Sequence, residues 1–136
     1  MVIDGLVMHY QTMTADDLRW KESQRTVKRT IALDFDGVLH RYSQGWKDGS
    51  IYDDPVYGAV DACRELKRRG YELVVFTARR NEDIPDWLVR HGFPPMPVTN
   101  TKPPALFYID DRAIRFERWA QALCDIVSLA DKAGEP

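Results

Sequence analysis

The sequence predicts an α/β domain in which a parallel β-sheet carries helices on both faces. From Thr30 onward, short apolar runs alternate with amphipathic stretches, which is typical of buried parallel strands joined by helices. Three of the four main runs also end in polar residues, although a buried sheet favours apolar ones. Open α/β sheets bind ligands beyond the carboxyl ends of their strands, so these polar residues indicate a site there.

The expected strands are short apolar runs at residues 31–33, 71–76, 97–98 and 106–109, with a fifth candidate at 114–116. The expected helices have apolar residues at helical spacing and lie at about 56–69, 83–91 and 117–130. The basic run 67–69 before Gly70 is typical of a solvated helix end rather than a nucleic-acid patch. Because βαβ connections are right-handed, we expect helices on both faces of the sheet.

Residues 1–28 precede this pattern and are expected to form an N-terminal extension of unassigned role. Thr14 followed by Asp17 resembles a capping box, which predicts the start of a helix. Residues 29–136 are expected to form a single domain, because no repeat or Pro/Gly/Ser-rich linker divides them. A chain of 136 residues with 44 % apolar residues can bury one core of useful size.

Composition narrows the classes of function. Nineteen basic and 21 acidic residues give a formal net charge of −2, so no overall basic charge attracts nucleic acid or an anionic membrane. No apolar run approaches the roughly 20 residues that span a bilayer, and the first residues lack the features of a signal peptide. Cys63 and Cys124 have no metal-ligand spacing and read as reduced, buried thiols. We therefore expect a soluble, cytoplasmic protein without a membrane partner.

Carboxylates dominate the polar strand ends. Asp34 and Asp36 follow the first strand, Thr77 follows the second, and Asp110 and Asp111 follow the fourth. These residues should converge at one edge of the sheet. Four carboxylates in one place require a compensating cation, and hard oxygen ligands suit Mg²⁺. The spacing of the first two carboxylates allows one to attack a reacting group while the other moves protons.

A single Asp-x-Asp-Gly is more typical of a strand followed by a turn with solvated acids. The other polar residues of this chain favour a functional site instead, because Thr77, Lys102 and the pair Asp110-Asp111 follow the Asp-x-Asp-Gly segment in the order that such a site requires. Together these segments resemble the four motifs of the haloacid dehalogenase-like (HAD) superfamily of phosphohydrolases: IALDFDGVL at 31–39, VVFT at 74–77, Lys102, and YIDD at 108–111.

The resemblance covers about residues 30–130 and implies a three-layer α/β/α Rossmann-like fold. It also implies that Asp34 is the nucleophile that forms an aspartyl-phosphate. Asp36 would protonate the leaving oxygen and then activate water. Mg²⁺ would be held by Asp34, by the backbone carbonyl of Asp36 and by the pair Asp110-Asp111. Within this pair, Asp110 is favoured as the direct ligand, and Asp111 is favoured as a ligand that acts through a water molecule. Val38 stands where many members have threonine, and no role depends on it.

Two further side chains have implied roles at the phosphate. Thr77 would hydrogen-bond a phosphoryl oxygen, and Lys102 would neutralise charge on the nucleophile and the transferring group. Each also has a simpler interpretation: Thr77 as a cap of the following turn, and Lys102 as an exposed loop lysine before two prolines.

The insertions that select substrates in this superfamily are short here, so the chain resembles the capless type. Residues 40–52 form a short flap with three aromatic residues, in which Trp46 either stacks on a flat leaving group or packs on the flap itself. His40 is close enough to the first motif to touch substrate, although His9, His40 and His91 are expected to be structural or exposed. An open site also makes a second copy of the chain a candidate partner.

Arg79 and Arg112 give a weaker resemblance to the phosphatase domains of polynucleotide kinase/phosphatases, which remove 3′-phosphates from nucleic acid ends. Arg79 is accordingly a candidate substrate-binding residue, although an arginine can also simply fix a neighbouring carboxylate. The sequence leaves the substrate open: it is a phosphorylated small molecule or, as the alternative, a nucleotide or a nucleic acid 3′-end, since an open site of the capless type accepts bulky or polymeric phosphates. A non-catalytic module that binds Mg²⁺ and phosphate is a further alternative. Asp34 and Asp36 count against it, since binding alone needs neither.

Overall fold

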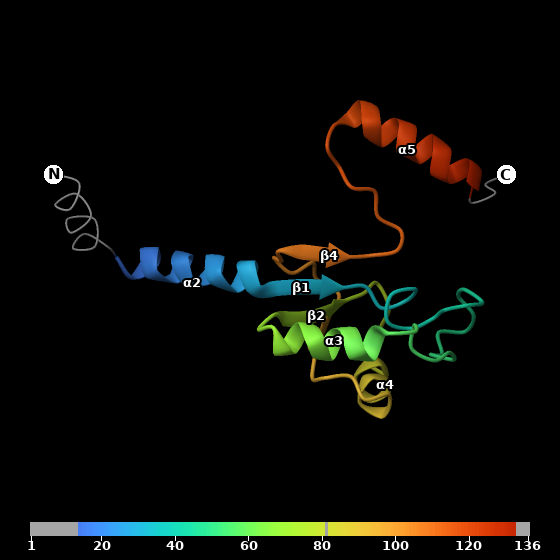
Figure 1. The fold of residues 1–136 in the computed structure, drawn as a ribbon, viewed down its shortest axis with the longest axis horizontal. Coiled ribbons are helices and arrows are strands. Elements are labelled where there is room, and N and C mark those ends of the chain that lie inside the picture. The colour runs from blue at the N-terminus through green and yellow to red at the C-terminus, as the bar shows by residue number, and fades with distance from the viewer. Residues whose placement is uncertain (1–13, 81, 133–136) are drawn as a thin grey trace.

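The computed structural model describes residues 14–80 and 82–132 and has a four-stranded, all-parallel sheet with flanking helices (Figure 1). This arrangement is a small α/β Rossmann-like fold and confirms the predicted class. The strands are, in spatial order, β3 (Val98–Thr99), β2 (Glu72–Phe76), β1 (Thr30–Leu33) and β4 (Phe107–Ile109). The helices are α2 (Ala15–Arg29), α3 (Ala59–Arg68), α4 (Ile84–Arg90) and α5 (Trp119–Lys132).

The inner strand β1 is the point at which the chain changes direction across the sheet. It pairs with β2 on one side and with β4 on the other, and all four of its side chains are buried. The chain first builds β2 and β3 on one side and then returns to build β4 on the other. A crevice for ligands is expected beyond the carboxyl end of such a strand.

The core lies on one face of the sheet, beneath α3 and α4. Ile31 pairs with Leu73 and Leu33 with Val75, so these side chains share a face and join one buried cluster with residues of both helices. Trp87 of α4 is 1 % exposed and stands edge-on to the ring of Phe35, with centroids 5.1 Å apart. This packing fixes the segment that immediately follows β1 and leads into the site.

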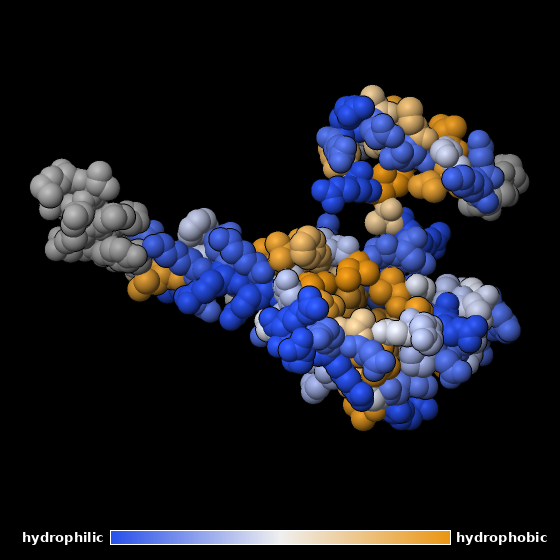
Figure 2. All heavy atoms as spheres, in the orientation of Figure 1, coloured by the Kyte–Doolittle hydropathy of each residue, from blue (hydrophilic) through white to orange (hydrophobic). Residues whose placement is uncertain are grey.

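The C-terminal part differs from the sequence-based expectation. The expected helix forms as α5, but its apolar side chains are not buried on the sheet: Trp119 is 70 % exposed and Leu123 is 59 % exposed. Figure 2 shows α5 standing apart from the body of the molecule, with apolar side chains on its surface. The expected strand at 114–116 is wrong for the described structure, because the chain leaves the sheet after β4 and this segment has no strand to pair with.

The predicted capping box at the start of α2 is confirmed. The Asp17 backbone N–H donates to Thr14 Oγ1 at 3.1 Å, and the Thr14 N–H donates to the Asp17 carboxylate at 2.9 Å. The helix continues to Arg29, directly before β1, and residues 1–13 of the expected extension, with His9, lie outside the described residues. Within the described ranges, no helix has the length and apolar character needed to cross a bilayer.

Candidate active site

The strand ends bring the expected carboxylates together. The Asp34 backbone N–H donates to the carbonyl of Ile109 at 2.9 Å, so the end of β1 lies beside the residues that follow β4. As a result, carboxylate oxygens of Asp34, Asp110 and Asp111 all lie within 4.8 Å of one another. This three-carboxylate cluster contains three of the four carboxylates that were expected to converge, and the carboxylate of Asp36 is not part of it.

Burial and neighbouring charge disfavour the ionised form of Asp34, whereas the carboxylates of Asp110 and Asp111 are exposed. The pKa of Asp34 is raised to about 6, chiefly by burial and further by the charges of Asp110, Asp111 and Asp36, although Asp34 Oδ1 accepts the Phe35 N–H at 2.8 Å. A hard divalent cation would relieve this repulsion. The donor set of carboxylate oxygens therefore fits Mg²⁺.

Gly37 gives Asp111 the space to join the cluster. Its φ is +85°, a conformation that favours glycine, and a Cβ at this position would lie 2.7 Å from Asp111 Cγ and closer still to the carboxylate. No role in the site was predicted for this glycine. The only signal was its position directly after Asp-x-Asp, which by itself is equally typical of an ordinary turn.

The Asp36 carboxylate has different neighbours from Asp34. Its Oδ1 lies 2.9 Å from Nδ1 of His40, and its Oδ2 accepts a hydrogen bond from Nε of Arg79 at 2.7 Å. Both partner side chains are buried, with His40 0 % and Arg79 8 % exposed. His40 is therefore structural, which is one of the two expected outcomes: its ring is buried and does not line the pocket, so its position close to the first motif does not bring it into the site.

Thr77 lies at the end of β2 and lines the same pocket as the two aspartates of the first motif. Its hydroxyl oxygen accepts the Arg79 backbone N–H at 3.1 Å, so the turn-capping interpretation describes a contact that is present. The hydroxyl hydrogen is not used in that contact. The Asn100 side chain also donates to the Thr77 carbonyl at 2.9 Å, which ties the end of β2 to the segment after β3.

Lys102 lies in a neighbouring hollow. Its ammonium is 4.7 Å from the centroid of the Tyr108 ring, and it lines a cavity of about 570 Å³ that it shares with Asp34 and Asp110. Asp36 and Thr77 instead line the larger pocket on the other side of Asp34. Lys102 is thus near the nucleophile candidate, but it is not a wall of the main pocket.

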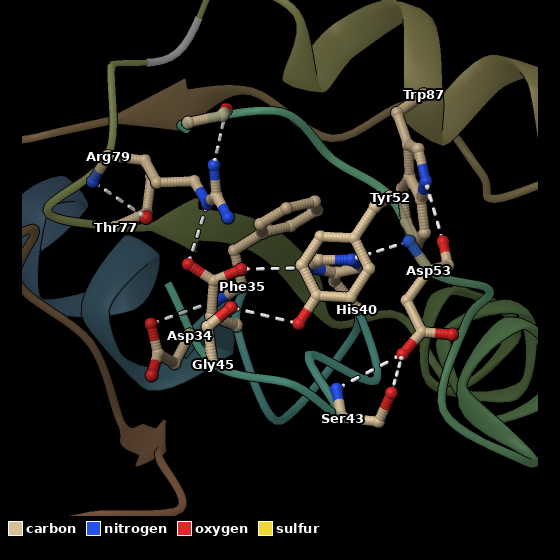
Figure 3. Close-up of polar contacts among 12 residues, drawn as sticks. Asp34, Phe35, His40, Ser43, Gly45, Tyr52, Asp53, Thr77, Arg79 and Trp87 are labelled. Atoms are coloured by element: carbon tan, nitrogen blue, oxygen red, sulfur yellow. Dashed lines mark hydrogen bonds and ion pairs between the residues drawn. The ribbon is translucent and has the colours of Figure 1, made fainter. Parts of the chain in front are cut away.

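Residues of the flap line this main pocket, which has a volume of about 770 Å³. A single antiparallel bridge between His40 and Pro55 closes the base of the flap in the described structure. Its interior is held by Tyr52, whose hydroxyl donates to the Gly45 carbonyl at 2.9 Å (Figure 3). Trp46 is 63 % exposed and lines the pocket, with the Arg79 guanidinium 5.0 Å from its ring centroid.

Arg112 also lines the main pocket, and its backbone N–H donates to Asp110 Oδ1 at 2.7 Å. Every expected site residue except Lys102 and Asp110 therefore borders this one pocket. Comparison of the chain with models of protein families, with curated proteins and with solved structures found no match. Function is accordingly inferred from the geometry and chemistry of the site.

Proposed function

We propose that this protein is a Mg²⁺-dependent phosphatase that hydrolyses a small phosphate monoester through a phosphorylated Asp34. The observation that carries the proposal is the place of Asp34. Asp34 directly follows the buried inner strand and belongs to the three-carboxylate cluster with Asp110 and Asp111. It also lines the main pocket, together with Asp36. A nucleophile, a cation site and a group able to move protons thus meet around one cavity.

The three-carboxylate cluster would hold the Mg²⁺, together with the backbone carbonyl of Asp36. A bound Mg²⁺ would neutralise the carboxylates and the incoming phosphate, so that two anions can approach each other. Thr77 would donate its hydroxyl hydrogen to a phosphoryl oxygen. These contacts would orient the phosphorus for attack in line with the leaving oxygen.

Asp34 Oδ2 is the attacking atom, since Oδ1 already accepts the Phe35 N–H. It forms a bond to phosphorus while the bond to the leaving oxygen breaks, and protonated Asp36 gives that oxygen its proton. Asp36 then takes a proton from a water molecule that attacks the phosphorus. The bond from phosphorus to Asp34 breaks, which releases inorganic phosphate and restores the carboxylate.

Charge and size favour a small substrate. The pocket is lined by six carboxylates and three arginines, one of which is paired with Asp36. This balance suits a cation and one phosphate better than a nucleic acid strand, whose binding requires several basic contacts. A volume of about 770 Å³ is in the usual range for a small-molecule site. A nucleotide is the second candidate, because the exposed Trp46 ring borders the pocket and offers a surface for a base.

Hydrolysis of p-nitrophenyl phosphate with Mg²⁺ tests the proposal. We expect turnover that disappears after chelation, and only background turnover for Asp34→Asn, because uncatalysed monoester hydrolysis is slower by factors approaching ~10²¹. Asp61→Asn, an exposed acid-to-amide change on α3, is the matched control and should behave as the wild type. Undiminished activity of Asp34→Asn would refute the covalent route. Binding of Mg²⁺ and phosphate without turnover of a panel of phosphate esters would instead favour the non-catalytic module.

A further inference from the structure

His40 is a fully buried polar side chain that the proposed mechanism does not use. Its ring is stacked on Phe35, with centroids 5.4 Å apart and planes 22° from parallel. The rings of Tyr52 and Trp87 stand edge-on to it, with centroids at 5.3 Å and 5.7 Å. Aromatic contacts on several sides therefore hold the ring in one orientation.

The hydrogen bonds of this ring define where its proton lies. Nε2 is 3.0 Å from the backbone nitrogen of Asp53, and a backbone N–H can only donate, so Nε2 must be the acceptor (Figure 3). The ring hydrogen is therefore on Nδ1. Nδ1 lies 2.9 Å from Oδ1 of Asp36 and donates to it.

The second oxygen of Asp36 is held by a different part of the fold. Arg79, which follows β2, donates from Nε to Asp36 Oδ2 at 2.7 Å and from a terminal nitrogen to the carbonyl of Gly49 at 2.8 Å. His40 and Arg79 thus hold the two oxygens of one carboxylate. Each also holds the flap: His40, its first residue, accepts from the N–H of Asp53, directly after its last residue, and Arg79 donates to the carbonyl of Gly49 within it.

From this arrangement we infer that His40 is a positioning residue for Asp36. The inference rests on the proposed function, in which Asp36 must point one oxygen at the leaving group. Donation from Nδ1 fixes the plane of the Asp36 carboxylate, and acceptance at Nε2 ties that plane to the base of the flap. His40 itself contacts no substrate, because it is buried beneath the pocket.

Two substitutions separate positioning from packing. In His40→Asn, the amide nitrogen takes the place of Nδ1 and keeps a donor for Asp36, while the Asp53 N–H loses its acceptor. In His40→Gln, the amide oxygen takes the place of Nε2 and keeps the acceptor for Asp53, while Asp36 loses its donor. Both variants lose the aromatic ring, so both should show a similarly lowered melting temperature.

We expect His40→Asn to keep kcat within about threefold of the wild type, and His40→Gln to lose on the order of 10- to 100-fold in kcat at unchanged KM. Both variants are assayed with Mg²⁺ and p-nitrophenyl phosphate, at a temperature below both melting temperatures. Equal losses in the two variants would overturn the inference and leave the proposed function standing. A wild type without hydrolytic activity would overturn the proposed function and the inference with it. Nitrogen-15 NMR of the unmodified protein adds a test that needs no variant to fold: a proton on Nδ1 of His40 supports the inference, and a proton on Nε2 overturns it.

Discussion

Replacing Gly37 by alanine should weaken metal binding through Asp111. The new Cβ would lie 2.7 Å from Asp111 Cγ and closer still to Oδ2, whereas carbon atoms in contact lie about 3.5 Å apart, so the carboxylate must move by at least about 0.8 Å. Mg²⁺ demands near-ideal octahedral geometry and usually keeps several of its waters, so a displacement of this size disturbs Asp111 whether it binds the ion directly or through a water. We expect Mg²⁺ affinity to fall on the order of 10- to 100-fold. The alanine must also adopt a φ near +85°, which costs about 1–2 kcal/mol of unfolding free energy.

Calorimetric titration with Mg²⁺, together with thermal unfolding without metal, tests this prediction. Gly70→Ala is the matched control, because Gly70 has a φ of +94° at the end of α3 and no atom within 4 Å of an added Cβ. Both variants should lose a similar free energy of unfolding, and only Gly37→Ala should lose Mg²⁺ affinity. Wild-type affinity in Gly37→Ala would refute the assignment of Asp111 to the metal. An equal loss in Gly70→Ala would show that backbone strain alone is responsible.

Three further predictions concern the same site. Because the pKa of Asp34 is raised to about 6, its carboxyl is protonated below that pH and Mg²⁺ must displace the proton. Titrations should therefore show that Mg²⁺ affinity falls as the pH is lowered from about 7 to about 5. An affinity for Mg²⁺ that does not depend on pH would contradict this prediction. Lys102→Ala should lower kcat on the order of 10²- to 10³-fold, because the Lys102 ammonium shares a cavity with Asp34 and would neutralise charge on that carboxylate during phosphoryl transfer. Steady-state kinetics with a change below tenfold would show that Lys102 is only a loop residue. Trp46→Ala should reduce kcat/KM for a nucleotide by a factor that corresponds to about 1–3 kcal/mol, but should barely change kcat/KM for an aryl-free monoester. The melting temperature should stay unchanged, because the ring is 63 % exposed. A uniform loss on both substrates would exclude stacking.

The fold and the carboxylate cluster were predictable because both depend on local pattern. The run 31–33 reads as a buried strand by its composition alone, and an acid directly after a parallel strand must lie at the carboxyl edge of the sheet. The capping box of α2 was predictable for the same reason, since its two residues are three positions apart.

The order of the residues is enough to predict which ionisable side chains gather at the carboxyl edge of the sheet. How Asp36 is held depends on the folded chain, because its partner Arg79 is 43 positions away and the ring of His40 is oriented by a backbone N–H 13 positions further along the chain. The same holds for residues 114–116 and for α5, whose patterns predicted a strand and a packed helix. The periodicity of apolar residues indicates which side chains can be buried. Burial and strand pairing also require a neighbouring helix or strand to pack against, and no local sequence pattern specifies where the chain will position that neighbour.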